Sequence, residues 1–470
     1  MESSDQKSLN AESLRADPRI AEARRLIAEA VADHSATMTA PKDPDPALVA
    51  SYQTLLERLG ATRGGPPFLP YLSSGLGNGP MIELADGSVK MDFIGGIGVH
   101  GCGHSHPAMI DAAIDGALED TVMQGNLQQH PPSIKMSERL IELAKKNGAR
   151  MDHCLLSTSG AMANENALKI AMHHNSPADR VIAFDNAFAG RSLAMAALTD
   201  KAKYRMGLPL VVNVDYLPFR DQADPKRSQK WAVDELQRLL KRHPGRYAAF
   251  WAEPVAGEGG YYPGSHEFFA AICKPLRDAG VPIIFDEIQS FSRTSMPFAF
   301  QHYGLDEFAD IVTLGKVTQV CATLYGKDFV PKGPLLSQTF TGASSSIASG
   351  MKILELLDAE GCFGKTGKNM TRHAYFAAAL EKLHAKYPKL VNGPFGEGMM
   401  IAFTPGDGSY DQAKLLMDTM FDLGLLCFLC GGEPTRIRFL PPPVTTTHDH
   451  IDAAIGLLDK SLEAFAKKLG

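Results

Sequence analysis

The middle of the chain alternates short apolar runs with longer segments in which apolar residues recur at helical spacing. Five of the apolar runs have the length and composition of strands, at 154–156, 181–184, 248–252, 281–285 and 311–314. Strands separated by helical segments are typical of parallel pairing, because a parallel pair needs a crossover connection. The pattern therefore predicts an α/β fold with a large, mostly parallel sheet.

The two ends of the chain have different patterns. Near the N-terminus we expect a helix over 18–33, a proline-rich linker at 41–46 and a hairpin formed by 81–84 and 88–93. After residue 343 we expect helices at 344–358, 368–386 and 448–469, and strands at 398–403, 425–429 and 436–440. Such a mixture favours a smaller α+β domain packed on the first.

These patterns divide the chain into four parts. Residues 1–45 form a helical extension and linker, 46–100 a segment associated with the small domain, 101–343 the large domain and 344–470 the C-terminal small domain. The helix of the extension is either an arm of a dimer or a solvated appendage.

Composition and charge exclude several classes of protein. The 470 residues include 47 Lys and Arg against 53 Asp and Glu, a formal charge of −6, and no basic stripe of the kind that binds nucleic acid. No apolar run approaches the roughly 18 residues of a membrane helix. The N-terminus is polar and acidic, unlike a secretory signal or a transit peptide. Seven cysteines, an odd number, favour a reducing compartment, so we expect a soluble, cytoplasmic protein.

Polar residues capable of chemistry follow each of the five predicted strands. They are the 157–159 serine and threonine run, Asp185, Glu253, Asp286 and Lys316. Open parallel sheets bind ligands outside the carboxyl ends of their strands. Five strands that deliver polar groups to one edge indicate a single site, and the site indicates an enzyme.

Asp286 and Lys316 are the strongest candidates for chemistry in this group. Asp286 closes a buried apolar strand, where an ionised carboxylate is unstable unless it meets a cation. Lys316 closes another strand, and burial of a lysine lowers its pKa and frees the amine for condensation with a carbonyl. The two side chains either perform such chemistry or simply pair with each other.

Two further segments are suited to binding. The 157–161 segment leads into a helix, whose free N–H groups and positive dipole end suit a phosphate, although Ser and Gly also cap helices for structural reasons. Phe188 can stack on a planar ring, and Arg191 can hold a carboxylate with two hydrogen bonds. The alternative for these two is a core phenylalanine and a surface arginine.

Taken together, these residues resemble the fold type I pyridoxal-phosphate (PLP) enzymes, and among them the class III, or ω-, aminotransferases. The matching motifs occur in the family's order: GHSHP at 103–107, SGA at 159–161, FAGR at 188–191, EPVAGEGG at 253–260, IFDEIQ at 284–289, TLGK at 313–316, TF at 339–340 and IRFLPP at 437–442. They extend over roughly residues 70–445, and eight motifs in order make the resemblance specific.

The resemblance implies a role for each residue of the cofactor site. Lys316 would condense with the cofactor and later move the proton between substrate and cofactor. Asp286 would hold the pyridine nitrogen protonated, so that the ring accepts electrons. Gln289 would bond the phenolic oxygen of the ring, while Ile288 and Phe188 would cover its two faces.

The phosphate and the partner subunit are also implied by the resemblance. Ser159, Gly160 and Ala161 would hold the phosphate. Thr339 would reach the phosphate bound by the neighbouring subunit, which implies a homodimer with shared active sites.

Glu258 and Arg438 match the family's substrate gate. An ω-aminotransferase binds two kinds of substrate in turn. The first has no carboxylate beside the reacting carbon, and the second has a carboxylate there. Glu258 would neutralise Arg438 for the first and swing away for the second, leaving Arg438 to bind the α-carboxylate of 2-oxoglutarate. Arg191 would hold the distal carboxylate of both. The alternative is a static buried ion pair.

The choice of amino donor rests on fewer residues. The TQVC segment at 318–321 is closer to lysine 6-aminotransferases, with 4-aminobutyrate aminotransferases as relatives, than to the glycine-rich form of most acetylornithine and ornithine enzymes. Ala189, Ala256 and Met162 depart from the family pattern, and the first two are expected near the substrate. L-Lysine, reacting at its ε-amine, is the favoured donor, with 4-aminobutyrate, ornithine or acetylornithine as alternatives.

Two other functions stay open at this point. A PLP-dependent aminomutase, racemase or decarboxylase would use the same fold, although the gate would then have less purpose. A non-catalytic binding protein would fit the replaced Ala189 and Ala256 but not the retained Lys316, Asp286 and Gln289. We expect no metal site, because the Cys427/Cys430 pair and the histidine pairs at 104/106 and 448/450 lack further ligands.

Overall fold

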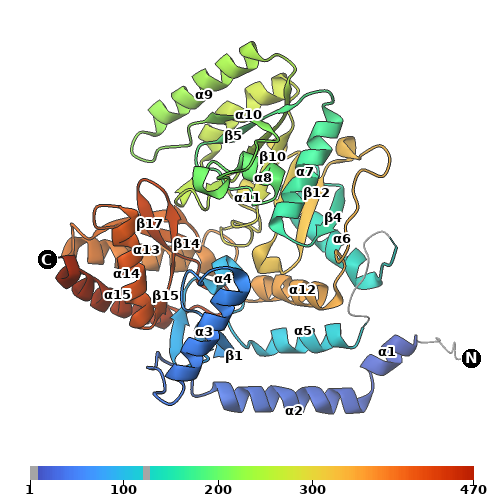
Figure 1. Cartoon of the computed structure of the whole chain (residues 1–470). Coiled ribbons are helices and arrows are strands. Elements are labelled where there is room, and N and C mark those ends of the chain that lie inside the picture. The colour runs from blue at the N-terminus through green and yellow to red at the C-terminus, as the bar shows by residue number, and fades with distance from the viewer. Residues whose placement is uncertain (1–8, 120–126, 470) are drawn as a thin grey trace, which may run out of the picture.

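A seven-stranded sheet is the centre of the computed structural model, which describes residues 9–119 and 127–469 (Figure 1). The order of its strands is β4-β12-β11-β10-β7-β5-β6. Their bounds are β4 His153–Ser157, β5 Arg180–Phe184, β6 Asn213–Leu217, β7 Tyr247–Ala252, β10 Ile283–Glu287, β11 Ile311–Leu314 and β12 Cys321–Tyr325. All five strands predicted in this part of the chain are present, so the α/β prediction is confirmed.

Only β12 runs against the other strands of this sheet. It pairs antiparallel with both β11 and β4, whereas the β10–β11, β7–β10, β5–β7 and β5–β6 pairs are parallel. The carboxyl ends of β4, β5, β7, β10 and β11 therefore lie at the same edge. This edge carries the polar residues that the sequence pattern singled out.

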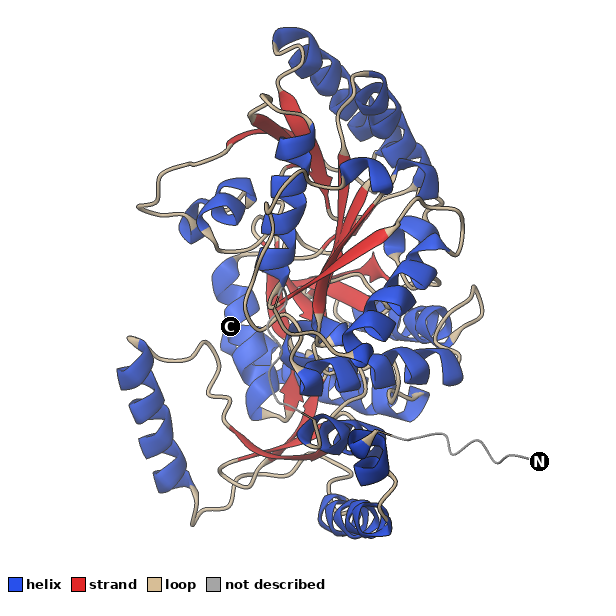
Figure 2. Ribbon diagram, turned by 90° about the vertical axis from the view of Figure 1, so that its right-hand side faces the viewer, coloured by secondary structure: helices blue, strands red, loops and turns tan. Residues whose placement is uncertain are grey.

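Helices cover both faces of the large sheet (Figure 2). They include α6 (Pro131–Lys145), α7 (Gly160–His174), α8 (Leu193–Leu198), α9 (Pro225–Arg242), α10 (His266–Asp278), α11 (Ala299–His302) and α12 (Ser344–Ala359). Helix α5 (Pro107–Ala117) packs on the outer side of α12 (Figure 1). The 3-10 turns are η1 (Ala202–Tyr204), η2 (Asp306–Phe308), η3 (Lys316–Thr318) and η4 (Lys327–Phe329). Although α12 follows residue 343, its Ile347 and Leu357 belong to the core beneath the large sheet, and the division of the chain at 343 stays a prediction.

The C-terminal part packs three helices on a second sheet of order β13-β14-β17-β16. Its elements are α13 (Lys368–Lys386), β13 (Val391–Glu397), β14 (Met400–Pro405), α14 (Tyr410–Asp422), β16 (Phe428–Gly431), β17 (Thr435–Phe439) and α15 (His448–Leu469). The strand predicted at 425–429 is wrong as one element. The chain leaves one sheet after β15 (Leu425–Leu426), and β16 belongs to the other sheet.

N-terminal strands complete this smaller unit. The strands β1 (Ser73–Asn78), β2 (Met81–Leu84) and β3 (Val89–Asp92) form an antiparallel sheet, and β3 pairs in parallel with β15. Phe93, just after β3, packs in one core with Phe376, Phe439 and Phe465. The predicted 81–84 and 88–93 hairpin is therefore present, and it shares a core with the C-terminal helices.

The first helices extend from the body of the molecule. They are α1 (Asn10–Arg15), α2 (Pro18–Ser35) and α3 (Val49–Arg63), followed later by the short α4 (Gly95–Gly98). Helix α2 lies along α5 (Figure 1), where Arg24 forms ion pairs with Asp111, at 2.6 Å, and with Asp115. Within residues 9–119 and 127–469, no helix combines the length and apolarity needed to cross a bilayer.

Candidate active site

The predicted site lies at the carboxyl edge of the large sheet. Glu253 directly follows β7, Asp286 is the second-last residue of β10, and Lys316 lies two positions after the end of β11. Asp286 is in register with Thr313 on the neighbouring strand. Lys316 lies close enough to Glu253, Glu258 and Asp286 for their charges to act on its pKa. The structure therefore brings these residues together, as the strand pattern predicted.

Lys316 has an unusual backbone and a perturbed side chain. Its φ of 54° lies in the left-handed region, which residues with a side chain seldom adopt and which is found often at functional sites. Burial lowers the pKa of its amine, because desolvation disfavours the ammonium form. A larger share of the lysine is therefore the neutral nucleophile that condensation with a carbonyl requires.

Asp286 forms no ion pair with Lys316, although the lysine is close enough for its charge to oppose the rise in the pKa of the carboxyl. Its Oδ1 accepts a hydrogen bond from the backbone N–H of Ile288 at 2.8 Å, and its Oδ2 accepts one from Asn164 Nδ2 at 2.6 Å. Burial raises the pKa of Asp286 to about 6, against the opposing effect of these bonds. A buried carboxyl of this kind is stabilised as an anion by a cationic partner such as a protonated ring nitrogen.

Asn164 is a site residue that the sequence analysis missed. It lies in α7 and is buried, and its Nδ2 also donates to the carbonyl of Ala189 at 2.8 Å. Its Oδ1 accepts from the hydroxyl of Thr313 at 2.7 Å. Asn164 thus fixes the carboxylate of Asp286 against two neighbouring elements. The available signal was a polar residue on the buried face of α7 that also carries Ala167, Leu168 and Ala171.

Replacing Asn164 tests this network. We expect Asn164→Ala to lower the free energy of unfolding by about 1–3 kcal/mol, because the change leaves buried polar partners without hydrogen bonds. Urea unfolding followed by circular dichroism measures the loss. Asn392→Ala, at an exposed position of β13, is the matched control and should change stability little. Equal stability of the two variants would contradict the network.

The start of α7 has the features of a phosphate site. Ser159 is the N-cap, and its side chain accepts from the N–H of Met162 at 3.2 Å. The first N–H groups of a helix have no partner within the helix and attract anions. A Cβ atom on Gly160 would lie 2.9 Å from Cγ2 of Ile288, so glycine allows the isoleucine to approach this turn. Ser159, Gly160 and Ile288 therefore lie together, as the motif implied.

Glu253 joins two loops of the site. Its carboxyl accepts from the backbone N–H of Phe188 at 3.1 Å and from that of Gly257 at 2.9 Å. Burial, followed by the charge of Asp286, raises the pKa of Glu253 to about 8. The residue thus links the loop that bears the expected ring-stacking Phe188 to the loop that bears Glu258. Sequence analysis placed Glu253 at the correct edge but assigned it no partner.

Ala189 and Ala256 are buried, with 2% and 6% of their surface exposed. Ala189 packs in a core cluster with Ala187 and Met195. Neither Ala189 nor Ala256 lines the cavity described below, so the expectation that they border the substrate gains no support from this cavity.

Glu258 and Arg438 form a buried ion pair, with Oε1 and Nη2 2.5 Å apart. Arg438 lies in β17 with none of its side chain exposed, and its Nη1 donates to Gln289 Oε1 at 3.2 Å. Burial alone would raise the pKa of Glu258, but the charge of Arg438 and its hydrogen bond lower it overall. The pair therefore spans the two parts of the molecule with both groups charged.

A cavity of about 630 Å³ opens beside Glu258. Its walls include Arg191, Lys201, Lys203 and Tyr204 from the large unit and Phe428 and Gly431 from the small one. Arg191 is exposed, and its guanidinium carbon lies 3.9 Å from the ring centroid of Tyr204. Three cations next to one carboxylate make this cavity suited to an anionic group.

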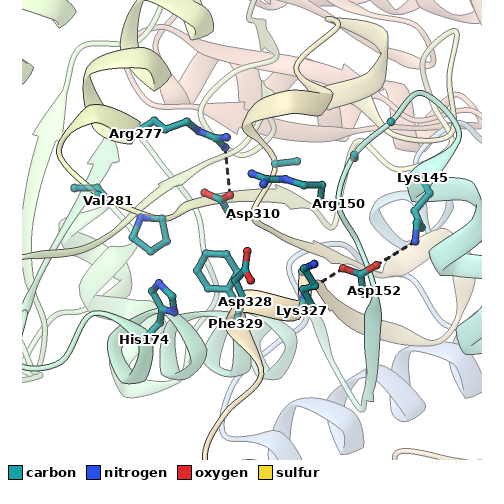
Figure 3. Close-up of a pocket in the computed structure, with 16 residues that line it drawn as sticks. Lys145, Arg150, Asp152, His174, Arg277, Val281, Asp310, Lys327, Asp328 and Phe329 are labelled. Carbon is teal, nitrogen blue, oxygen red and sulfur yellow. Dashed lines mark hydrogen bonds and ion pairs between the residues drawn. The ribbon is translucent and has the colours of Figure 1, made fainter.

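A second cavity, of about 660 Å³, lies at the opposite edge of the large sheet (Figure 3). It contains Asp310, which precedes β11, whereas Lys316 follows that strand. Its charges are partly neutralised, because Lys145 pairs with Asp152 at 3.1 Å and Arg277 with Asp310 at 3.2 Å. Four residues of strand separate this cavity from Lys316 by about 13 Å, so the second cavity lies away from the residues at the carboxyl edge. The first cavity adjoins that edge through Glu258.

Thr339 lies apart from these groups, on an exposed segment between η4 and α12. The preceding Gln338 donates to Asn166 of α7 at 3.1 Å. A contact between Thr339 and a neighbouring subunit stays a prediction.

The residues at the sheet edge fit pyridoxal 5'-phosphate in each part that the structure describes. Lys316 offers an amine with a lowered pKa, and Asp286 offers a buried carboxylate. The first turn of α7, which begins at Gly160 shortly after the end of β4, offers free N–H groups for the phosphate. Fold and site together define a PLP-dependent enzyme of fold type I.

Comparison with known proteins gives the family. The model of the class-III aminotransferases matches residues 68–462, and the chain belongs to this family. It is 31% identical over 402 residues to acetylornithine aminotransferase of Methanocaldococcus jannaschii, covering 82% of this chain and 92% of that protein. It is 28% identical over 417 residues to L-lysine-epsilon aminotransferase of Mycobacterium tuberculosis, covering 82% and 90%.

Solved structures agree on the fold. Lysine aminotransferase from M. tuberculosis in its internal aldimine form superposes with a TM-score of 0.76 at 24% identity, covering 87% of this chain and 99% of that one. A transaminase from the marine bacterium Virgibacillus gives a TM-score of 0.79 at 17% identity, covering 89% and 100%. The chain is thus a class III aminotransferase that uses PLP.

Proposed function

We propose that this aminotransferase moves a terminal amino group from an amino acid donor to 2-oxoglutarate in two half-reactions. The observation that carries the proposal is the buried Glu258–Arg438 pair beside Lys316. Removing one partner of a buried ion pair strongly destabilises the other, so Arg438 needs an anion whenever Glu258 leaves it. Glu258 supplies that anion for one substrate, and a substrate carboxylate supplies it for the other.

The residues of the chain divide the work around the cofactor. PLP, when bound, supplies an aldehyde that condenses with amines and a ring that takes up electrons. Lys316 holds the cofactor between turnovers and carries a proton at its Nζ during them. Asp286 keeps a proton on the ring nitrogen, and Asn164 holds Asp286 in place.

The gate accounts for the use of two unlike substrates. A donor that reacts at a terminal amine has no carboxylate near Arg438, so Glu258 remains paired with it. The acceptor 2-oxoglutarate has an α-carboxylate, which takes the place of Glu258 with two parallel hydrogen bonds. Arg191, in the cavity beside Glu258, binds the distal carboxylate in both half-reactions.

L-Lysine, reacting at its ε-amine, is the donor that we favour. The TQVC segment at 318–321 supports this choice. Similarity to L-lysine-epsilon aminotransferase and to a [LysW]-aminoadipate semialdehyde transaminase, at 28% and 30% identity, supports a donor with a terminal amine. 4-Aminobutyrate, ornithine and acetylornithine are the alternatives. We also propose a cytoplasmic homodimer in which Thr339 reaches the partner's phosphate site.

A visible absorption spectrum of the purified protein tests the proposed function. We expect the cofactor band to bleach on addition of L-lysine and to return on addition of 2-oxoglutarate, because each half-reaction changes the form of the cofactor. A band that persists with lysine but bleaches with another ω-amino acid would contradict only the choice of lysine as donor. A bleached band that 2-oxoglutarate fails to restore would contradict the proposed acceptor.

A further inference from the structure

Lys201 lies where the loop of Glu258 meets the end of β16. It lies three positions after the end of α8, and its Nζ donates to the carbonyl of Glu258 at 2.7 Å and to that of Gly431 at 3.0 Å. The N–H of Gly431 donates to the same Glu258 carbonyl at 2.8 Å. Lys201 therefore connects the loop of Glu258 to the end of β16 in the smaller unit.

The ammonium of Lys201 has a donor to spare. An ammonium group carries three N–H donors, and the hydrogen bonds among the described residues use two of them, both on neutral carbonyls. None of the ion pairs in the described part of the chain includes Lys201, so its charge has no carboxylate partner. Lys201 lines the same cavity as Glu258.

The proposed gate needs a second position for the carboxylate of Glu258. When a substrate carboxylate binds Arg438, Glu258 loses its partner. Its side chain is largely buried, and an unpaired charge is strongly disfavoured there. Lys201 is already bonded to the backbone of Glu258. Rotation about the side-chain bonds of Glu258 brings its carboxylate towards the same ammonium while the backbone stays in place.

We propose that Lys201 is the second partner of Glu258. Its ammonium binds the carboxylate of Glu258 when Arg438 binds the acceptor. This inference rests on the proposed function, because it assumes that the gate opens. It makes Lys201 a positioning residue that acts through Glu258. The gate then exchanges one ion pair for another, and neither position leaves a buried charge alone.

Lys203 and Arg191 are the other cations of the cavity, but they lie differently. Lys203 Nζ lies 5.3 Å and 5.5 Å from the ring centroids of Tyr204 and Tyr410, and Arg191 lies over Tyr204. Among the described residues, neither Lys203 nor Arg191 forms a hydrogen bond to the Glu258 loop, whereas Lys201 does. The hydrogen bonds of the loop therefore select Lys201.

Binding of glutarate to the PLP-loaded enzyme tests the proposal by calorimetry. Glutarate has both carboxylates of 2-oxoglutarate but no ketone, so it reports gate opening without turnover. We expect Lys201→Met to raise the glutarate dissociation constant about tenfold, because the open position of Glu258 loses its partner. Lys201→Arg should restore binding to within about threefold of wild type, since it keeps the charge.

A double-mutant cycle separates the gate from a direct contact with the ligand. In Glu258→Ala, Arg438 is free and glutarate should bind more tightly than to wild type. If Lys201 acts through Glu258, adding Lys201→Met to Glu258→Ala should leave the dissociation constant unchanged. A tenfold loss in this background as well would mean that Lys201 contacts the ligand or supports the fold, and would overturn the proposal. So would an unchanged constant in Lys201→Met alone.

The wild-type enzyme distinguishes this test from that of the proposed function. Wild type that binds glutarate and reacts with 2-oxoglutarate supports the proposed function whatever the variants do. Wild type that binds no glutarate and does not react with 2-oxoglutarate overturns both the acceptor and the role of Lys201.

Discussion

Lys316→Ala is expected to reduce transamination by about 10⁴-fold or more, because it removes both the amine that holds the cofactor and the base that moves the proton. Rates of glutamate formation measure the loss. Borohydride reduction followed by mass spectrometry gives a second readout: it should fix the cofactor covalently to wild type but not to the variant. Both results follow from a single amine with a lowered pKa at the end of β11.

Lys327→Ala is the control for this variant. Lys327 is exposed and lies in the cavity at the opposite edge of the sheet (Figure 3), so its loss should leave the rate within about twofold of wild type. Turnover by Lys316→Ala near the wild-type rate, or cofactor fixed by reduction to another lysine, would show that the catalytic role belongs elsewhere.

Asp286→Asn is expected to lower kcat by about 10²–10³-fold, the effect of removing one preorganised electrostatic group from an active site. Asparagine keeps the shape of the side chain but carries no charge to hold a proton on the ring nitrogen. Single-turnover rates with the donor measure the change, and the absorption spectrum of the bound cofactor should shift with the protonation of its ring.

The matched control is Asp185→Asn. Asp185 also follows a strand of the large sheet at the same edge, but its side chain is exposed. The Asp185→Asn variant should react at close to the wild-type rate. If both variants lose activity equally, the effect comes from general charge at this edge of the sheet, and the assignment of Asp286 to the ring nitrogen is wrong.

Most of the large sheet could be predicted because its strands are short, apolar and bounded by helices. Two strands were missed. The sequence of β6, NVDYL, is not a continuous apolar run, and β12 follows the Lys316 turn directly, without an intervening α-helix. The break between β15 and β16 was missed because apolar residues continue through Cys427, and only pairing with distant strands decides where one sheet ends. Register with remote partners is not encoded in the local pattern.

In the candidate site, too, some residues could be predicted from the sequence and others could not. Lys316, Asp286, Glu253 and Glu258 could be located because each follows a recognisable strand or lies in a motif. Asn164 and Lys201 could not, since their roles depend on hydrogen bonds to residues more than fifty positions away along the chain. A polar side chain in a helix or loop has many possible partners, and only the folded chain selects one.

The pairing of β3 with β15 bears on how the protein folds during its synthesis. The N–H of Met91 donates to the carbonyl of Gly424, and that of Phe93 to the carbonyl of Leu426, so β3 needs a partner that is synthesised after every strand of the large sheet. The strands of the large sheet all lie between His153 and Tyr325 and become available to one another much earlier. In a nascent chain this edge of β3 therefore stays unpaired until Leu425 and Leu426 have left the ribosome, and unpaired strand edges are prone to aggregate during that period.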